Sequence, residues 1–292
     1  MTHHTINGLN YHVEERGAGA PVIMLHGFTG STETWRPLMN KLEQAFRVVT
    51  IDLPGHGQTD APPKADRYRM ELVADDLAGL IHRLKATPAH WLGYSMGGRL
   101  ALYMACRLPK LVRSLILESA SPGIIDQRER KARIEQDTSL ARRIEREGIA
   151  QFVDHWQSIP LFDTQKHLPE EIRSALRSQR LKNSAAGLAN SLRGMGTGVQ
   201  PELWSELGSL KMPVLLITGE DDQKFTNINR RMAAAISGSR LETVPNTGHT
   251  VHLESAELYS DLVLNFLSAL SEDNGQYLPH TEKSDEYERG HR

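Results

Sequence analysis

The chain has little cysteine, little net charge and no long apolar run, and each shortage excludes a class of protein. Its 292 residues include one cysteine, Cys106, so no disulfide can form within the chain and a reducing compartment is expected. The formal net charge of −2 argues against a nucleic-acid-binding surface. No apolar run approaches the roughly 20 residues of a membrane helix, and the first residues lack the basic and apolar regions of a signal peptide. We therefore expect a cytoplasmic protein that binds neither nucleic acid nor a membrane.

The apolar and charged residues that are present, 39% and 24%, suit a globular chain. Apolar runs typical of buried strands alternate with amphipathic helical segments, and Asn7-Gly8 marks an antiparallel hairpin near the start. Such alternation predicts an α/β fold, a mostly parallel twisted sheet with helices on both faces. The predicted strands are residues 22–25, 46–51, 89–92, 112–117, 213–218 and 241–244, and the predicted helices are residues 32–42, 69–84, 99–106, 227–236 and 255–270.

The alternation stops over residues 121–210, where charged helical segments follow one another with no strand signal. We predict a helical lid here, inserted before the last strands. Residues 1–120 and 211–270 then form the core, and the polar residues 271–292, which have almost nothing to bury, are expected to be disordered. Ligands of such sheets bind beyond the carboxyl ends of the strands, which the lid would cover.

Residues 93–99, Gly-Tyr-Ser-Met-Gly-Gly-Arg, lie between an apolar run and a helical segment. The pattern G-x-S-x-G in this position predicts a nucleophile elbow, a sharp turn that exposes Ser95 at a helix N-terminus. Glycines around the serine let two backbones pass closely. The alternative is a glycine-rich turn with an incidental serine.

A serine hydroxyl needs a group that takes its proton, and in this layout an acid and then a histidine follow along the chain. Asp222 follows one predicted strand, with Asp221 and Glu220 as alternatives, and three adjacent carboxylates would also suit a solvated turn. His249 lies in the loop after the last strand, with His252 as the alternative. We predict a Ser95–His249–Asp222 triad in which the acid fixes the histidine tautomer.

An oxyanion hole needs two N–H donors aimed at one point. The backbone N–H of Met96, which follows the serine, is the first, and that of Phe28, after His26-Gly27, is the second. We expect His26, Asp52 and His56 to organise loops rather than to react.

Arg99 lies four residues after Ser95, on roughly the same side of the predicted helix. It is either solvated surface or a cation that faces the site and binds an anionic substrate. The predicted lid is also rich in arginine, and arginines turned inward would bind carboxylates in bidentate fashion.

Together these motifs resemble the α/β-hydrolase superfamily over about residues 5–270. Finer features resemble one family within it, the 2-succinyl-6-hydroxy-2,4-cyclohexadiene-1-carboxylate synthases of menaquinone biosynthesis. The features are residues 25–30 with Trp35, residues 52–57, the elbow ending in Arg99, residues 121–123 and 199–201 at the two ends of the lid, and residues 219–225, Gly-Glu-Asp-Asp-Gln-Lys-Phe.

The resemblance implies a 2,5-elimination that expels pyruvate from 2-succinyl-5-enolpyruvyl-6-hydroxy-3-cyclohexene-1-carboxylate. The triad would remove a proton α to the succinyl carbonyl, and the enolate would lie in the Phe28 and Met96 hole. No cofactor or metal is implied. The partner would be a small anionic polycarboxylate, and the protein would be a monomer or a weak homo-oligomer.

The resemblance also implies which side chains bind this substrate. Besides Arg99, two lid arginines would hold carboxylates. They are placed at Arg133 and Arg180, with Arg130 and Arg177 as alternatives. Tyr94 and Trp156 match pocket residues, although a packing role suits Trp156 nearly as well.

Two other functions fit the same motifs. One is a serine carboxylesterase or C–C-bond hydrolase, for which arginines in the lid would have no purpose with an apolar substrate. The other is a ligand-sensing α/β-hydrolase that signals to a protein partner and turns over slowly.

Overall fold

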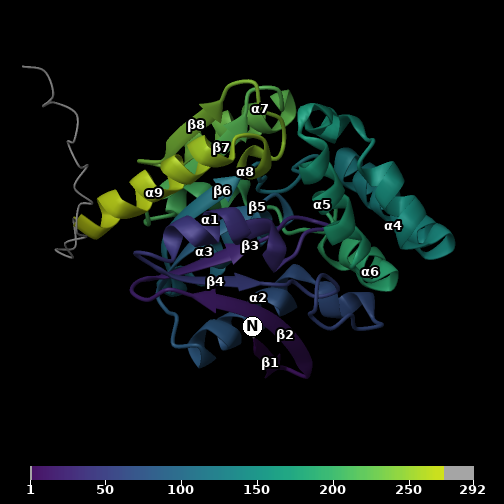
Figure 1. The fold of residues 1–292 in the computed structure, drawn as a ribbon, viewed down its shortest axis with the longest axis horizontal. Coiled ribbons are helices and arrows are strands. Elements are labelled where there is room, and N and C mark those ends of the chain that lie inside the picture. Colours follow the sequence, from purple (N-terminus) through teal and green to yellow (C-terminus); the bar gives the residue numbers. More distant parts are fainter. Residues whose placement is uncertain (1, 273–292) are drawn as a thin grey trace, which may run out of the picture.

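The computed structural model describes residues 2–272 and contains an eight-stranded sheet in the order β1-β2-β4-β3-β5-β6-β7-β8 (Figure 1). The first two strands and the β2–β4 pair are antiparallel, and the other pairs are parallel. The hairpin turn has positive φ at Asn7 (44°) and Gly8 (81°), as predicted from this pair. The strands are β1 (Thr2–Ile6), β2 (Leu9–Arg16), β3 (Pro21–Leu25), β4 (Arg47–Ile51), β5 (Ala89–Tyr94), β6 (Val112–Glu118), β7 (Val214–Gly219) and β8 (Arg240–Val244).

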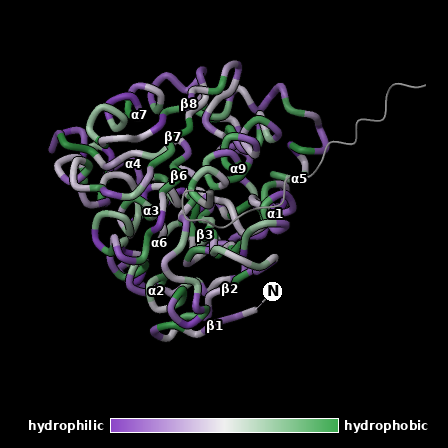
Figure 2. The backbone as a smooth tube through the Cα atoms, turned by 90° about the vertical axis from the view of Figure 1, so that its left-hand side faces the viewer, coloured by the Kyte–Doolittle hydropathy of each residue, from purple (hydrophilic) through white to green (hydrophobic). Residues whose placement is uncertain are grey.

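Helices cover both faces of the sheet, because each face carries apolar side chains that must be buried. On one face, α2 (Met70–Arg83), α3 (Met96–Arg107) and α7 (Gln223–Ala235) pack into one hydrophobic core. On the other, α1 (Arg36–Leu42) and α9 (Ala256–Glu272) pack into a second. In Figure 2 the hydrophobic stretches of the backbone gather around the central strands. The prediction of a mostly parallel sheet covered on both faces is confirmed.

Between β6 and β7 the chain forms α4 (Gln127–Trp156), α5 (Glu170–Leu181) and α6 (Ala185–Met195), which gather at one side of the molecule (Figure 1). We call residues 119–213 the helical insertion. It has a small core of its own, made by α4 and α6. The backbone of α4 breaks at Gly148, where φ is 79°.

Three local details differ from the predictions made from sequence. The helix expected over residues 32–42 is a 3₁₀ turn (Thr32–Trp35) followed by α1, which begins with Pro37 in its first turn. Helix α7 begins four residues early, at Gln223, because Asp222 caps it. A short helix, α8 (Val251–Glu254), precedes α9, which runs two residues into the expected tail.

The rest of the expected tail lies outside the described residues. Among residues 2–272, no helix has both the length and the apolar character needed to cross a membrane.

Candidate active site

The turn between β5 and α3 places Ser95 in a backbone conformation that few residues adopt, with φ 48° and ψ −106°. Its N–H donates to the carbonyl oxygen of Glu118 at 2.8 Å, which fastens the turn to β6. A Cβ on Gly93 would lie 2.4 Å from the carbonyl oxygen of Gly97, and one on Gly97 would lie 2.3 Å from that of Leu25. Only glycine fits at these two positions, as the elbow motif predicts.

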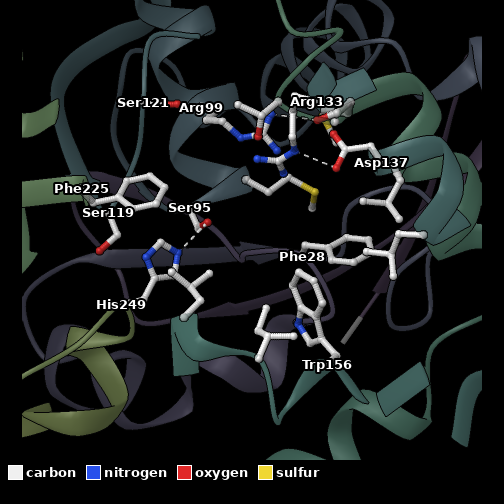
Figure 3. Close-up of a pocket in the computed structure, with 18 of the residues that line it drawn as sticks. Phe28, Ser95, Arg99, Ser119, Ser121, Arg133, Asp137, Trp156, Phe225 and His249 are labelled. Carbon is white, nitrogen blue, oxygen red and sulfur yellow. Dashed lines mark hydrogen bonds and ion pairs between the residues drawn. The ribbon is translucent and has the colours of Figure 1, made fainter. Parts of the chain in front are cut away.

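The side chains of Ser95, His249 and Asp222 form one hydrogen-bonded chain. Nε2 of His249 lies 3.1 Å from Oγ of Ser95, and Nδ1 lies 2.5 Å from Oδ2 of Asp222 (Figure 3 shows the first contact). The histidine and aspartate side chains are almost fully buried. The carboxylate therefore keeps a proton on Nδ1 and leaves Nε2 to accept one.

The alternative acids and histidine lie elsewhere. Asp221 and Glu220 are exposed, and Glu220 accepts a bond from the N–H of Asn246 instead. His252 turns away from Ser95, and its Nδ1 contacts both carboxylate oxygens of Glu118, at 2.8 and 2.9 Å. The structure thus brings together the three residues that the sequence favoured.

The loop that carries His249 is fixed from several sides. Glu254 accepts hydrogen bonds from the N–H groups of Gly248 (2.8 Å) and Thr250 (3.1 Å) on either side of it. The rings of Phe225 and Tyr94 pack on the imidazole, with centroids 4.6 and 5.4 Å away. This packing holds the imidazole in place beside the serine.

Phe28 and Met96, whose backbone N–H groups are the predicted donors of the oxyanion hole, both line the same cavity as Ser95. Neither donates a hydrogen bond to another group within residues 2–272. The Phe28 loop is held by His26, whose Nδ1 contacts the carbonyl oxygen of Gly27 (2.8 Å) and whose Nε2 accepts from the N–H of Leu53 (3.0 Å). Burial lowers the pKa of His26, so the ring is neutral and both bonds are kept at neutral pH.

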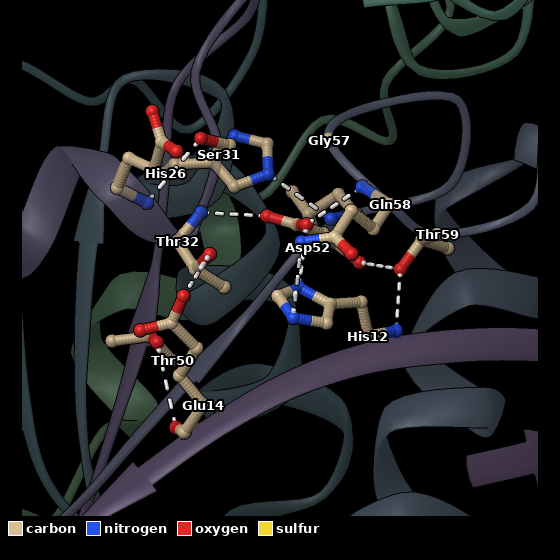
Figure 4. Close-up of polar contacts among 12 residues, drawn as sticks. His12, Glu14, His26, Ser31, Thr32, Thr50, Asp52, Gly57, Gln58 and Thr59 are labelled. Atoms are coloured by element: carbon tan, nitrogen blue, oxygen red, sulfur yellow. Dashed lines mark hydrogen bonds and ion pairs between the residues drawn. The ribbon is translucent and has the colours of Figure 1, made fainter. Parts of the chain in front are cut away.

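A buried polar cluster centred on Asp52 joins the residues after this loop to neighbouring elements (Figure 4). Asp52 accepts hydrogen bonds from the N–H of Thr32 (2.6 Å) and of Gln58 (2.8 Å), and its Oδ2 lies 2.8 Å from Nδ1 of His12. These bonds tie β2 and the loops after β3 and β4 together. Asp52 therefore organises loops, as the sequence suggested.

The cavity beside Ser95 has a volume of about 310 Å³ and lies between the sheet edge and the helical insertion. Arg99 is only 8% exposed and lines it, so the alternative of a solvated surface arginine is wrong. Its Nη1 donates to the carbonyl oxygen of Met195 (2.8 Å) and to Oε1 of Gln200 (3.0 Å). Burial and the nearby Arg133 lower the pKa of Arg99 to about 10, so it stays charged at neutral pH.

Arg133, on α4, lines the same cavity, and its Nε donates to Oδ1 of Asp137 at 2.8 Å. Two cations thus face one cavity with the serine (Figure 3). Oδ2 of Asp137 is buried with no hydrogen-bond partner among the described residues.

Arg180 does not line this cavity. It lines a neighbouring one, where its guanidinium packs over the ring of Phe162, 5.2 Å from the ring centroid, and Phe162 lines both cavities. Its alternative, Arg177, forms an ion pair with Asp154 on the surface. Arg130 donates to the carbonyl oxygens of Gly198 and Gln200 and so fastens the insertion together.

Tyr94 and Trp156 both line the Ser95 cavity. Trp156 packs edge-on against Phe28, with centroids 5.3 Å apart, and its Nε1 is buried without a partner among residues 2–272. Burial raises the pKa of the Tyr94 phenol, which stays protonated.

Sequence reasoning did not select Lys224 and Asp137, which line the same cavity. Lys224 has no ion-pair partner in the described part of the chain, and its Nζ lies 5.7 Å from the ring centroid of Phe225. The run of residues 222–225, which was noted only as a family feature, was the signal for it. The signal for Asp137 was its position four residues after Arg133 in the same helical segment, a spacing at which the two side chains can form an ion pair.

The chain is similar to known proteins over most of its length. The model of the α/β-hydrolase fold family matches residues 20–256. The chain belongs to this family. A protein of Bacillus subtilis strain 168, provisionally named 2-succinyl-6-hydroxy-2,4-cyclohexadiene-1-carboxylate synthase, is 46% identical over 90% of this chain and 97% of its own length. The synthase of that name from Serratia proteamaculans is 33% identical over 84% of this chain and 92% of its own.

Solved structures agree with the sequence relatives. MenH from S. aureus superposes with a TM-score of 0.86 at 35% identity, covering 93% of this chain and all of its own. A thermophilic esterase from Thermogutta terrifontis, with malate bound, superposes with a TM-score of 0.83 at 26% identity, covering 92% of this chain and 99% of its own. The resemblance to the synthases and the α/β-hydrolase fold are both confirmed.

Proposed function

We propose that this chain is a 2-succinyl-6-hydroxy-2,4-cyclohexadiene-1-carboxylate synthase of menaquinone biosynthesis, a lyase that expels pyruvate from 2-succinyl-5-enolpyruvyl-6-hydroxy-3-cyclohexene-1-carboxylate. The observation that carries the proposal is the buried guanidinium of Arg99 in the same cavity as Ser95 and His249. Asp137 is near this buried charge but already pairs with Arg133, so a neutral ester would add no counterion to the two arginines, whereas a substrate carboxylate would. The names of the relatives support the same reaction.

The reaction begins with removal of the proton α to the succinyl carbonyl. Oγ of Ser95, whose own proton passes to Nε2 of His249, takes that proton, and the electrons of the C–H bond move to the carbonyl oxygen as an enolate. The N–H groups of Phe28 and Met96 donate to this oxygen, an interaction worth about 3–4 kcal/mol for each donor. The enolate then re-forms the carbonyl, a ring double bond forms between C2 and C3, the existing double bond shifts from C3–C4 to C4–C5, and the C5–O bond breaks. The enolate of pyruvate leaves and takes up the proton held on Nε2 of His249, which gives pyruvate and restores the neutral base.

The carboxylates of the substrate are held by cations on both sides of the cavity. Arg99 comes from α3 and Arg133 from α4, so the substrate would bridge the sheet and the helical insertion. To bind Arg133, a substrate carboxylate must either displace Asp137 from the guanidinium or share the guanidinium with it. Arg180 lines the neighbouring cavity, and Lys224 is a third cation that lines the cavity of Ser95.

The wider proposal is a cytoplasmic enzyme, monomeric or weakly homo-oligomeric, that uses neither a cofactor nor a metal. Residues 1–120 and 211–270 form its catalytic core, and residues 121–210 form a lid over the substrate. The helical insertion contributes Arg133 and Trp156 to the cavity, which supports this division.

The test is pyruvate release from enzymatically generated substrate, measured for the wild type and for Ser95→Ala. The proposal expects turnover within the ordinary range of about 1–10³ s⁻¹ and its loss in the variant. Brisk cleavage of p-nitrophenyl acetate without pyruvate release would instead make the protein a carboxylesterase. Absence of both activities would favour a ligand sensor.

A further inference from the structure

The sequence motifs at the two ends of the helical insertion, residues 121–123 and 199–201, have no role in the reaction proposed above. In the structure these two segments lie against each other. Nε2 of Gln200 donates to the carbonyl oxygen of Ser121 at 3.0 Å. The N–H of Leu203, just after the second segment, donates to a carbonyl oxygen of the first at 2.8 Å. The insertion therefore begins and ends at the same place.

The same glutamine holds Arg99, the buried cation of the Ser95 cavity. Gln200 is 1% exposed, and its Oε1 accepts a hydrogen bond from Nη1 of Arg99 at 3.0 Å. The carbonyl oxygen of Met195, at the end of α6, accepts a second bond from the same nitrogen at 2.8 Å. Both acceptors belong to the helical insertion, whereas Arg99 belongs to α3 of the core. The direction of this guanidinium is therefore set by the insertion.

These two bonds leave one edge of the guanidinium available to a ligand. A guanidinium carries N–H donors on Nε, Nη1 and Nη2. Within residues 2–272, Arg99 donates side-chain hydrogen bonds only from Nη1. Two parallel N–H groups on one edge of an arginine match the two oxygens of a carboxylate. The Nε–Nη2 edge of Arg99 is thus left for such a group.

The acceptors that hold Arg99 are neutral. A carbonyl oxygen and an amide oxygen orient a cation through their dipoles, but they do not cancel its charge. The carboxylate of Asp137 acts on Arg99 only from a distance, because its Oδ1 accepts from Nε of Arg133 at 2.8 Å. A glutamate in place of Gln200 would have the same shape but would neutralise the arginine.

The amide of Gln200 is itself fixed at both ends. Its nitrogen is held by Ser121 and its oxygen by Arg99, so the side chain cannot turn without losing both bonds. Arg130 on α4 holds the backbone beside it, since its Nε donates to the carbonyl oxygen of Gly198 (2.8 Å) and its Nη2 to that of Gln200 (3.3 Å). A binding group is held accurately when the residues that support it are locked by hydrogen bonds of their own.

We propose that Gln200 is a positioning residue, which directs the Nε–Nη2 edge of Arg99 to the substrate carboxylate and leaves the charge of the arginine intact. This inference rests on the proposed function, because it takes Arg99 to be a carboxylate-binding group. Gln200 does not line the Ser95 cavity and acts through Arg99. The helical insertion then contributes to carboxylate binding twice, directly through Arg133 and indirectly through Gln200.

The kinetics of pyruvate release test the proposal in the wild type, Gln200→Leu, Arg99→Gln and the double variant. Gln200→Leu is expected to raise KM by about tenfold and to change kcat less, because it disturbs a binding contact and leaves the triad in place. In the Arg99→Gln background the same change should add less than about twofold, because its effect passes through the arginine. Gln151→Leu, at an exposed position of α4, is the control and should match the wild type.

A purely structural role for Gln200 would give a different pattern. The two changes would then act independently, and the effect of the double variant would be the product of the single effects. That result, or an unchanged KM in Gln200→Leu, would overturn the proposal.

A variant of the same shape keeps the test decisive if Gln200→Leu fails to fold. Gln200→Glu gives up the bond to Ser121 but retains an acceptor for Arg99 and cancels its charge. KM for pyruvate release is expected to rise by about tenfold or more, whereas kcat/KM for p-nitrophenyl acetate, a neutral ester, stays within about twofold of the wild type. The exposed Gln151→Glu adds the same charge and should change neither value. An unchanged KM in Gln200→Glu would overturn the proposal.

Failure of the proposed function would be distinguishable from failure of this inference. A wild type that releases no pyruvate would overturn the proposed function, and calorimetric binding of tricarballylate, an unreactive tricarboxylate, then decides the role of Gln200. Binding should be about tenfold weaker in Gln200→Leu and should fall little further when that change is added to Arg99→Gln. Equal binding by the wild type and Gln200→Leu, or no binding by the wild type at millimolar tricarballylate, would overturn the positioning role.

Discussion

Nε2 of His249 lies 3.1 Å from Oγ of Ser95, although one residue precedes the helical insertion and the other follows it. The parallel sheet makes this possible, because the loops after β5 and β8 emerge at the same edge. The opposite nitrogen of the ring is held by Asp222 at 2.5 Å. The tautomer of the base therefore depends on one buried carboxylate.

Replacing Asp222 by asparagine should lower kcat for pyruvate release by about 10⁴-fold, the effect seen when a triad loses its acid and the histidine adopts the wrong tautomer. Asp221→Asn, one residue away and exposed, is the matched control and should remain near the wild type. Steady-state kinetics on both variants measures the difference. Equal losses of kcat in the two variants would show that Asp222 is not the acid of the triad.

Arg133→Gln should raise KM by about 10- to 100-fold and change kcat less, because the lost contact holds a carboxylate that does not react. Arg146→Gln is the control, since that arginine lies on the same helix and its side chain is 70% exposed. An unchanged KM in Arg133→Gln would show that α4 contributes no cation to substrate binding.

Glu118 links the elbow to the histidine loop, because its carbonyl oxygen accepts from the N–H of Ser95 and its carboxylate from the N–H of His252. Glu118→Gln cannot accept at both oxygens and should lower the free energy of unfolding by about 1–3 kcal/mol. Urea denaturation measures this, with the exposed Glu135→Gln as control. A change below about 0.5 kcal/mol would show that the buried carboxylate contributes little.

The stability of the protein should fall in acid, partly through His90. Burial lowers the pKa of this histidine from 6.5 to about 4, so the unfolded chain binds the proton more readily and stability is lost as the pH falls from 6.5 towards 4. The loss from this group is about 3 kcal/mol at pH 4. His90→Gln, which cannot titrate, should flatten the pH dependence of urea midpoints over this interval. The exposed His167→Gln should leave the dependence as it is, and an equal slope in all three proteins would contradict the account.

Much of the fold could be read from the sequence because its signals are local. The apolar runs of the central strands and the Asn7-Gly8 turn act within a few residues. The elbow is equally local, since the glycines around Ser95 are required by contacts with adjacent backbone. The start of α7 was missed because its signal is a cap by Asp222, a residue already assigned to the triad.

The cavity that each lid arginine lines was harder to predict, because it depends on packing between elements that are distant in the sequence. Arg180 has the same residue type and a similar helical setting as Arg133, yet Phe162 separates it from the Ser95 cavity. The spacing of residues along α4 and α5 does not contain this information. Lys224 was passed over for the related reason that its position depends on how the loop after β7 folds.

The central claim is that a triad in a carboxylate-binding cavity performs an elimination. The most direct measurement compares kcat/KM for pyruvate release and for p-nitrophenyl acetate hydrolysis in the wild type and in Arg99→Gln. The account predicts efficient pyruvate release that falls by about tenfold or more in the variant, while the slow cleavage of the neutral ester hardly changes. Brisk ester cleavage that is indifferent to Arg99, with no pyruvate formed, would contradict the account.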